Sequence, residues 1–143
     1  MCGVIAVLRR HSTRPEPDGA ALLAALDAAL EALGRGFEGV AGAAAAAGDV
    51  DRALRGVPGT AALVGDQALA SAIGERAARL DARIATLEAT LDAGPLDLGG
   101  RPVEEVNAAL VACKDAVWAV GRDRLRTAAA VGDLAGPGAG RGA

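Results

Sequence analysis

The chain has 143 residues and a formal net charge of −3, a length that fits one ordinary domain or a piece of a larger one. This charge balance gives no electrostatic basis for binding nucleic acid or an anionic membrane, so we expect neither as a partner. Hydrophobic residues make up 52% of the chain, yet it holds one Phe, one Trp and no Tyr. Because aromatic side chains usually supply much of a core's buried area, we expect thin layers of Ala, Leu and Val between closely spaced helices.

The two cysteines, Cys2 and Cys113, do not form the regular pattern of a disulfide framework. The apolar run at residues 4–8 is too short for the core of a secretory signal, and two arginines follow it. No long uncharged apolar stretch predicts a transmembrane helix. These features predict a reducing, cytoplasmic location.

The first predicted elements are a strand and an amphipathic helix. Residues 4–8 contain two Val and one Ile, which favours a short buried β-strand. Pro15 and Pro17 predict a loop, and Asp18 is a suitable N-cap for a helix that ends near Gly34. Residues 37–54 predict a weaker helix that could break near Gly48, because each Gly lowers helix propensity by roughly 1 kcal/mol relative to Ala.

Two longer helices are predicted after a turn at Pro58 and Gly59. The first covers residues 66–93 and repeats apolar residues at alternating spacings of four and three. The second covers residues 102–133, begins at Pro102 and continues the same spacing. Their apolar positions are Ile73, Ala77, Leu80, Ile84, Leu87 and Leu91 in the first helix, and Val106, Leu110, Cys113, Val117 and Val120 in the second.

We therefore expect a mainly α-helical chain, with one N-terminal strand followed by about four helices. The helices at residues 66–93 and 102–133 are expected to pack as an antiparallel hairpin. Residues 1–10 would form the strand segment, residues 11–135 the helical region, and residues 136–143 a flexible Gly-rich tail.

Cys2 is the most informative residue for function. Removal of Met1 is favoured when the second residue is small, and it leaves Cys2 with a free α-amine beside its thiol. With an unperturbed pKa of roughly 7.7–8.0, this amine is a base near neutral pH and can accept the thiol proton, directly or through water. The resulting thiolate is the effective nucleophile, and Gly3 leaves space for substrate beside the backbone.

The segment Met1-Cys2-Gly3-Val4-Ile5-Ala6 resembles the opening of the class II, N-terminal-nucleophile (Ntn) glutamine amidotransferases, such as glucosamine-6-phosphate synthase. The resemblance implies that the chain is a fragment or an insertion of an αββα Ntn domain. It also implies that Cys2 attacks the side-chain amide of glutamine, forms a glutamyl thioester and releases ammonia for a sugar phosphate. Glutamine and a sugar phosphate are thus the implied partners, and no cofactor or metal is implied.

The helical region carries a second, looser likeness. Residues 114–120 and 122–126 are similar to a helical insertion that follows the first strand in some long bacterial glucosamine-6-phosphate synthase-like proteins. Those proteins also carry sugar-isomerase domains. No catalytic motif accompanies this likeness, so it implies nothing further about site residues.

Other groups that the family uses are missing. The family takes oxyanion donors from an Asn-Gly pair, but the only Asn is Asn107, which precedes Ala108. The Arg-Gly-x-Asp-Ser type of segment and the family's glutamine-binding Arg have no counterpart. Because an oxyanion donor is worth on the order of 10²–10³ in rate, this chain alone is expected to be nearly inactive and to act as the N-terminal portion of a larger enzyme.

The remaining polar candidates favour structural roles. His11, the only histidine, is expected in a surface loop, and together with two distant cysteines it gives no metal-ligand spacing. Cys113 lies on the apolar seam and is expected to be a buried thiol. A solvated helix face is the favoured interpretation of the cluster Arg122, Arg124 and Arg126, because carboxylates interleave it. The alternative is that this cluster contacts the sugar phosphate that the resemblance implies.

The rival function is a non-enzymatic helical interaction module. In this hypothesis the apolar seam from Ile73 to Leu91 binds another chain through its regular spacing. The competing interpretation is that the seam packs on residues 106–120 of the same chain. A stable monomer that retains its helicity on dilution would count against the interaction module.

Overall fold

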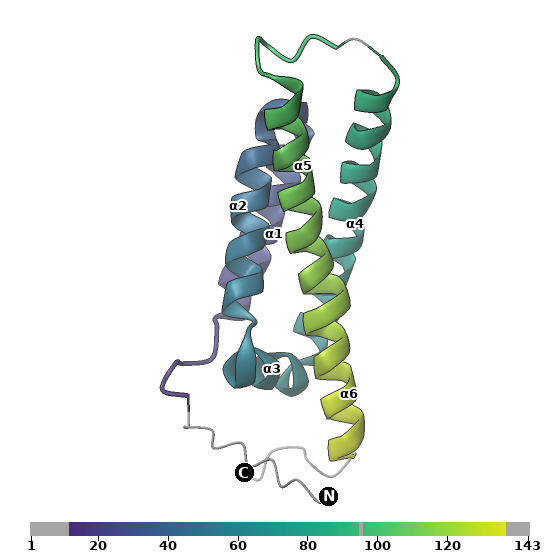
Figure 1. Ribbon diagram of the computed structural model, residues 1–143. Coiled ribbons are helices and arrows are strands. Elements are labelled where there is room, and N and C mark those ends of the chain that lie inside the picture. The colour runs from purple at the N-terminus through teal and green to yellow at the C-terminus, as the bar shows by residue number, and fades with distance from the viewer. Residues whose placement is uncertain (1–11, 95, 137–143) are drawn as a thin grey trace, which may run out of the picture.

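The computed structural model describes residues 12–94 and 96–136 (Figure 1). Within these residues every regular element is a helix, and the bundle contains one π-helical stretch. The elements are α1 (Gly19–Gly34), the 3-10 helix η1 (Gly36–Gly39), α2 (Val40–Ala53), α3 (Gly56–Gly65), α4 (Gln67–Asp92), α5 (Val103–Trp118), the π-helix η2 (Ala119–Arg124) and α6 (Leu125–Ala135).

The long helices α1, α2, α4 and α5 form a four-helix bundle (Figure 1). α1 packs against α2 and α4, and α5 packs against the same two helices from the other side. The short helix α3 lies across one end of the bundle, and α6 extends α5 towards that end and contacts α3. The described chain both begins and ends at the α3 end of the molecule.

Local sequence signals set the helix ends. The side chain of Asp18 accepts a hydrogen bond from the Ala20 backbone N–H (3.1 Å), and that of Asp66 accepts one from Leu69 (2.9 Å). Each cap satisfies one of the N–H groups that lack a partner within the helix. Pro102 precedes α5, whose first turn carries two Glu residues, and their charge favours the positive end of the helix dipole.

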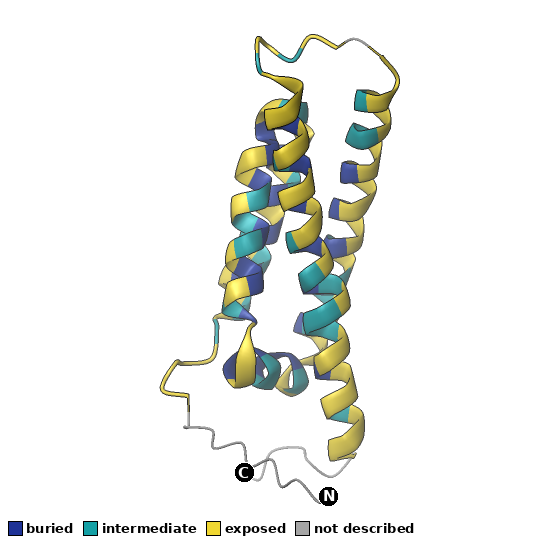
Figure 2. Ribbon diagram, viewed as in Figure 1, coloured by how far each residue is buried: buried dark blue, intermediate teal, exposed yellow. Residues whose placement is uncertain are grey.

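The core consists of small aliphatic layers, as the composition indicates (Figure 2). Ala29 of α1 and Ala43 and Ala47 of α2 are completely buried, so the backbones of these two helices lie close together. Larger side chains fill the space between the pairs of helices. The largest fully buried ones include Leu26, Leu54, Ile73, Leu80, Ile84 and Leu110.

The predicted αββα architecture is wrong. The described residues contain no strand and therefore no sheet on which layered helices could pack. The apolar faces of the long helices are buried against one another instead of against a sheet. The strand predicted at residues 4–8 lies outside the described residues and finds no support. The mainly helical part of the fold prediction is confirmed.

The turn predicted at Pro58 and Gly59 is also wrong, because both residues lie inside α3. Pro58 is the third residue of this helix, where its missing N–H removes no intrahelical hydrogen bond. Gly59 is buried, and a Cβ at this position would overlap the backbone of Leu54. The two residues therefore allow a tight corner between α2 and α3. The predicted weakness at Gly48 does not break α2.

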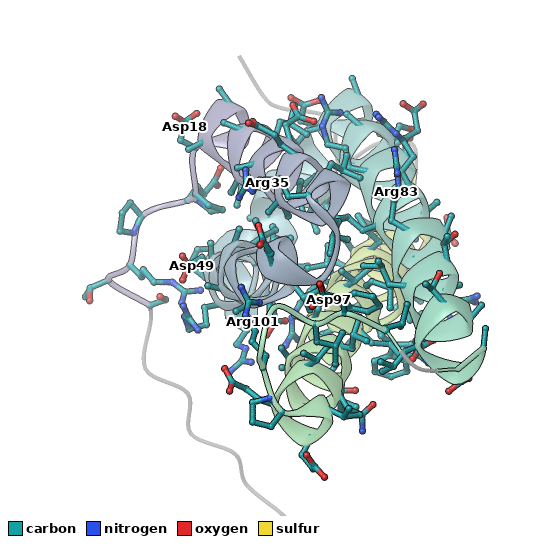
Figure 3. The ribbon with its side chains drawn as sticks, turned by 90° about the horizontal axis from the view of Figure 1, so that it is seen from above. Asp18, Arg35, Asp49, Arg83, Asp97 and Arg101 are labelled. Carbon is teal, nitrogen blue, oxygen red and sulfur yellow. The ribbon has the colours of Figure 1, made fainter. Side chains whose placement is uncertain are left out.

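Polar contacts join the helices across the bundle. Arg76 of α4 donates to both carboxylate oxygens of Asp27 in α1, at 2.8 and 3.1 Å, and this hydrogen bonding lowers the pKa of the Asp27 carboxyl. At the end opposite α3, Arg101 donates to the carbonyl oxygen of Phe37 (3.1 Å). Figure 3 looks onto that end, where Arg101 and Asp97 belong to the connection between α4 and α5.

Candidate functional site

The predicted nucleophile Cys2 and the single histidine His11 lie outside the described residues. The described residues that come first in the chain contact the corner between α2 and α3 through Arg14. There, the guanidinium of Arg14 donates to the carbonyl oxygen of Arg52 (3.4 Å) and to that of Arg55. A cation at this position complements the carbonyls at the negative end of α2. Arg14, in the described stretch before α1, therefore lies at the α3 end of the bundle.

The second thiol, Cys113, is completely buried in α5, as the sequence indicates. Burial raises the pKa of its thiol to about 11, because an apolar environment disfavours the charged thiolate. Near neutral pH this thiol is almost entirely protonated, so Cys113 has the character of a packing residue. Asn107 is exposed on α5, and the described residues contain no cluster of His, Cys, Asp or Glu that could hold a metal ion.

Asp51 in α2 is the one buried charged residue among those described, and it binds two arginines. Arg124 of η2 donates from Nε to Oδ1 at 2.9 Å, and Arg55 donates from Nε to Oδ2 at 3.0 Å. Arg124 also pairs with Asp123 at 2.9 Å. This network contradicts the prediction of a solvated face for Arg124, because its side chain is only 22% exposed. It is a structural tie between α2 and η2.

A groove between α4 and α5 contains the exposed side chain of Trp118. Trp118, at the end of α5, is 60% exposed, although large aromatic side chains are usually well buried. The groove has a volume of about 500 Å³. We call it the Trp118 groove; it is lined by Asp81, Ile84, Ala85 and Glu88 of α4 and by Lys114, Trp118, Arg122 and Arg126 of α5, η2 and α6.

The four lining residues of the second wall, from Lys114 to Arg126, are spaced four apart, and η2 keeps them in line. In a straight α-helix such residues drift around the axis by roughly 40° per step, because one turn holds 3.6 residues. The hydrogen bonds of a π-helix run from i to i+5 and widen the turn. In the π-helix a step of four residues is less than one full turn, so the side-chain positions rotate around the axis in the opposite direction and compensate for the drift in the α-helical part. The π-helical stretch at residues 119–124 therefore holds Arg122 and Arg126 on the Trp118 side.

The charges of the groove are only partly balanced. The Lys114 ammonium donates to both carboxylate oxygens of Glu88, at 2.8 and 3.0 Å, and this pairing raises the pKa of Lys114. The side chains of Arg122 and Arg126 make no hydrogen bond or ion pair with other described residues. With three cations and two carboxylates, the groove has a positive excess, whereas the chain as a whole carries −3.

Sequence reasoning missed this groove. It gave Trp118 no functional role and favoured a solvated face for Arg122 and Arg126. The available signal was the four-residue spacing of a basic, an aromatic and two further basic residues along one helical segment. The shift of register in η2, which places Arg122 and Arg126 on the same side as Trp118, has no clear sequence signature.

Comparison with known proteins identifies no relative. No family model matches the chain, and no curated protein or solved structure is significantly similar to it. Among the described residues, no helix is both long enough and apolar enough to cross a membrane.

Proposed function

We propose that this chain supplies the nucleophile-bearing N-terminal portion of a glutamine amidotransferase that passes ammonia to a sugar phosphate, as glutamine–fructose-6-phosphate aminotransferase does. The observation that carries the proposal is the segment Met1-Cys2-Gly3-Val4-Ile5. By average residue usage, Cys-Gly followed by Val or Ile in these positions arises by chance in about one start in ten thousand. The proposed location of the reaction is the cytoplasm.

The chemistry requires only the atoms of Cys2 for its first step. The α-amine takes the thiol proton, and the thiolate sulfur attacks the side-chain amide carbon of glutamine. The carbon–nitrogen bond then breaks, and the leaving nitrogen takes the proton from the α-ammonium and departs as ammonia. Water hydrolyses the resulting thioester to glutamate. Donors for the oxyanion and groups that bind glutamine must come from outside the described bundle, so the bundle alone is expected to be inactive.

Substitution of Cys2 tests the proposal. The polypeptide produced from the native gene is incubated with a diazoketone analogue of glutamine, and labelled peptides are identified by mass spectrometry. We expect one label on the peptide containing Cys2, protection by excess glutamine, and no label in Cys2→Ala. Glutamine hydrolysis by the same variant is expected to fall by more than about 10³-fold, as for other removed nucleophiles.

Cys113→Ala is the matched control, because its thiol is buried and has a raised pKa. This variant is expected to keep the label on Cys2. Equal labelling of the wild type and Cys2→Ala would exclude Cys2 as the nucleophile. Labelling of Cys2 that glutamine does not block would show general thiol reactivity and would also contradict the proposal.

The second candidate function is a non-enzymatic helical interaction module. Its original basis is weakened, because Ile73, Leu80 and Ile84 of the apolar seam are buried within the chain. What favours it now is a mostly apolar cleft of about 780 Å³ among α3, α4 and α6. If association were obligate, dilution would dissociate the assembly, which sedimentation would detect, and the separated chains would lose helicity, which circular dichroism would detect. A monomer that keeps its helicity on dilution contradicts this candidate.

A further inference from the structure

The Trp118 groove offers a ligand two kinds of contact on one wall. Trp118 presents an exposed aromatic surface, which can stack on a flat or apolar ring. Arg122 and Arg126 follow at steps of four residues and are free of ion pairs with the described residues. A guanidinium presents N–H donors in a planar fork that matches the oxygens of a phosphate or carboxylate. The wall therefore combines an aromatic surface with two adjacent anion-binding groups.

The opposite wall defines which anion fits. Asp81 and Glu88 line the groove from α4, and Glu88 is occupied by Lys114 at 2.8 Å. Asp81 remains as a hydrogen-bond acceptor that faces the same space, suited to a hydroxyl or amine N–H on a ring. An extended acidic peptide would bring further carboxylates towards Asp81 and Glu88, and this repulsion disfavours it. A compact ligand with one concentrated charge avoids that cost.

The groove is also large enough for a small molecule. Its volume of about 500 Å³ lies within the range of roughly 300–1,000 Å³ that is usual for ligand sites. The π-helix that forms part of the wall is a second sign, because π-helical turns cost regular hydrogen bonding and occur often at functional sites. Here it keeps Arg122 and Arg126 on the same side as Trp118.

We propose that the Trp118 groove binds a phosphorylated ring compound, with its phosphate on Arg122 and Arg126 and its ring on Trp118. Asp81 accepts a hydrogen bond from a polar group of the ring. Both a sugar phosphate and a nucleotide have this chemistry, since each joins a phosphate to a ring that stacks on an indole. No atom of Cys2 takes part in this site, so it does not depend on the proposed attack on glutamine; only its identification as the acceptor site, if the ligand is a sugar phosphate, would rest on the proposed function.

The chain provides its own probe for this site. Trp118 is the only Trp, and the chain has no Tyr, so its ultraviolet fluorescence reports on the groove alone. The full chain is titrated with glucose 6-phosphate, AMP, glucose, adenosine and inorganic phosphate, each at the same ionic strength. We expect a saturable change in fluorescence with at least one phosphorylated ring compound, and binding at least tenfold weaker for its unphosphorylated ring and for inorganic phosphate. The stronger of glucose 6-phosphate and AMP identifies the type of ring.

Variants assign the binding to the two arginines. Arg122→Gln/Arg126→Gln is expected to weaken binding at least tenfold without loss of helicity, because both side chains are exposed. Arg83→Gln is the matched control: Arg83 is an exposed arginine of α4 that does not line the groove (Figure 3), and its affinity should match that of the wild type. Cys2→Ala should also bind normally, so this proposal and the glutamine reaction can fail separately.

Four results would overturn the proposal. One is the absence of a saturable signal with both phosphorylated probes, and another is an affinity that the double arginine variant does not change. Equal affinity for inorganic phosphate would show a site without recognition of the ring. Tighter binding of a poly-glutamate peptide than of either phosphorylated probe would instead make the groove a protein-docking surface.

Discussion

Replacing Asp51 with Ala is expected to destabilise the bundle by about 2–3 kcal/mol. The Asp51 carboxylate is 6% exposed and binds Arg124 of η2 and Arg55. Without it, the guanidinium of Arg124 remains largely enclosed and loses its contact with α2. Removal of one partner from a fully buried pair costs about 3–5 kcal/mol. We expect a smaller cost of about 2–3 kcal/mol for Asp51, because Arg55 is 58% exposed and Arg124 keeps its contact with Asp123.

Asp49→Ala is the matched control for this prediction. Asp49, labelled in Figure 3, lies two residues earlier in α2. It also pairs with an arginine, Arg52, but both side chains are about two-thirds exposed. Exposed pairs contribute about 0–1 kcal/mol. Both substitutions remove a negative charge near the C-terminal end of α2, so any gain from the helix dipole is common to them. Urea unfolding, followed by circular dichroism, measures the free energies of unfolding of the two variants. Equal values for Asp51→Ala and Asp49→Ala would contradict the buried role of Asp51.

The parts of the fold that follow from local periodicity could be predicted from the sequence. Residues 66–93 were predicted as a helix and α4 spans Gln67–Asp92, because its apolar residues repeat regularly over many turns. Asp18 was predicted as an N-cap, and its carboxylate fills that role. Such signals need only neighbours in the sequence.

Features that depend on distant contacts could not be predicted in this way. The Pro58-Gly59 pair is a turn signal in isolation, but the close approach of Gly59 to Leu54 places it inside α3. The seam of α4 was expected to pack on the last helix, yet α4 also packs against α1. Alternation of arginine and aspartate around Arg124 suggests solvent, and only the position of Asp51 on another helix shows that this arginine points inward.

The two candidate sites also differ in whether they depend on local sequence or on contacts between distant residues. The chemistry of Cys2 was inferred from its own amine and thiol and from the resemblance of residues 1–6, and its position lies outside the described residues, so its role stays a proposal. The Trp118 groove needs two helices and a π-helical shift of register, which no local pattern specifies. The thin core that brings the helices close together was, by contrast, indicated by the many alanines.

Gly39→Ala is expected to destabilise the bundle by about 3 kcal/mol, at or above the upper end of the usual cost of overpacking. Gly39 ends η1 and is buried against α1. A Cβ at this position would overlap the backbone carbonyl of Ala32. Backbone atoms cannot rotate away as a side chain can, so α1 and α2 would have to separate or the η1 turn would have to distort. Separation would also open the alanine layer between these two helices.

Gly42→Ala is the matched control, because the same residue of α1 is its nearest neighbour. A Cβ at Gly42 would lie 4.0 Å from the Ala32 Cβ, an ordinary van der Waals contact. Gly42 is an exposed position inside α2, where Ala is favoured over Gly by about 0.8–1 kcal/mol. The two substitutions add the same methyl group three residues apart, yet we expect opposite changes in the free energy of unfolding in urea. If both variants were stabilised, the close contact between α1 and the start of α2 would be wrong.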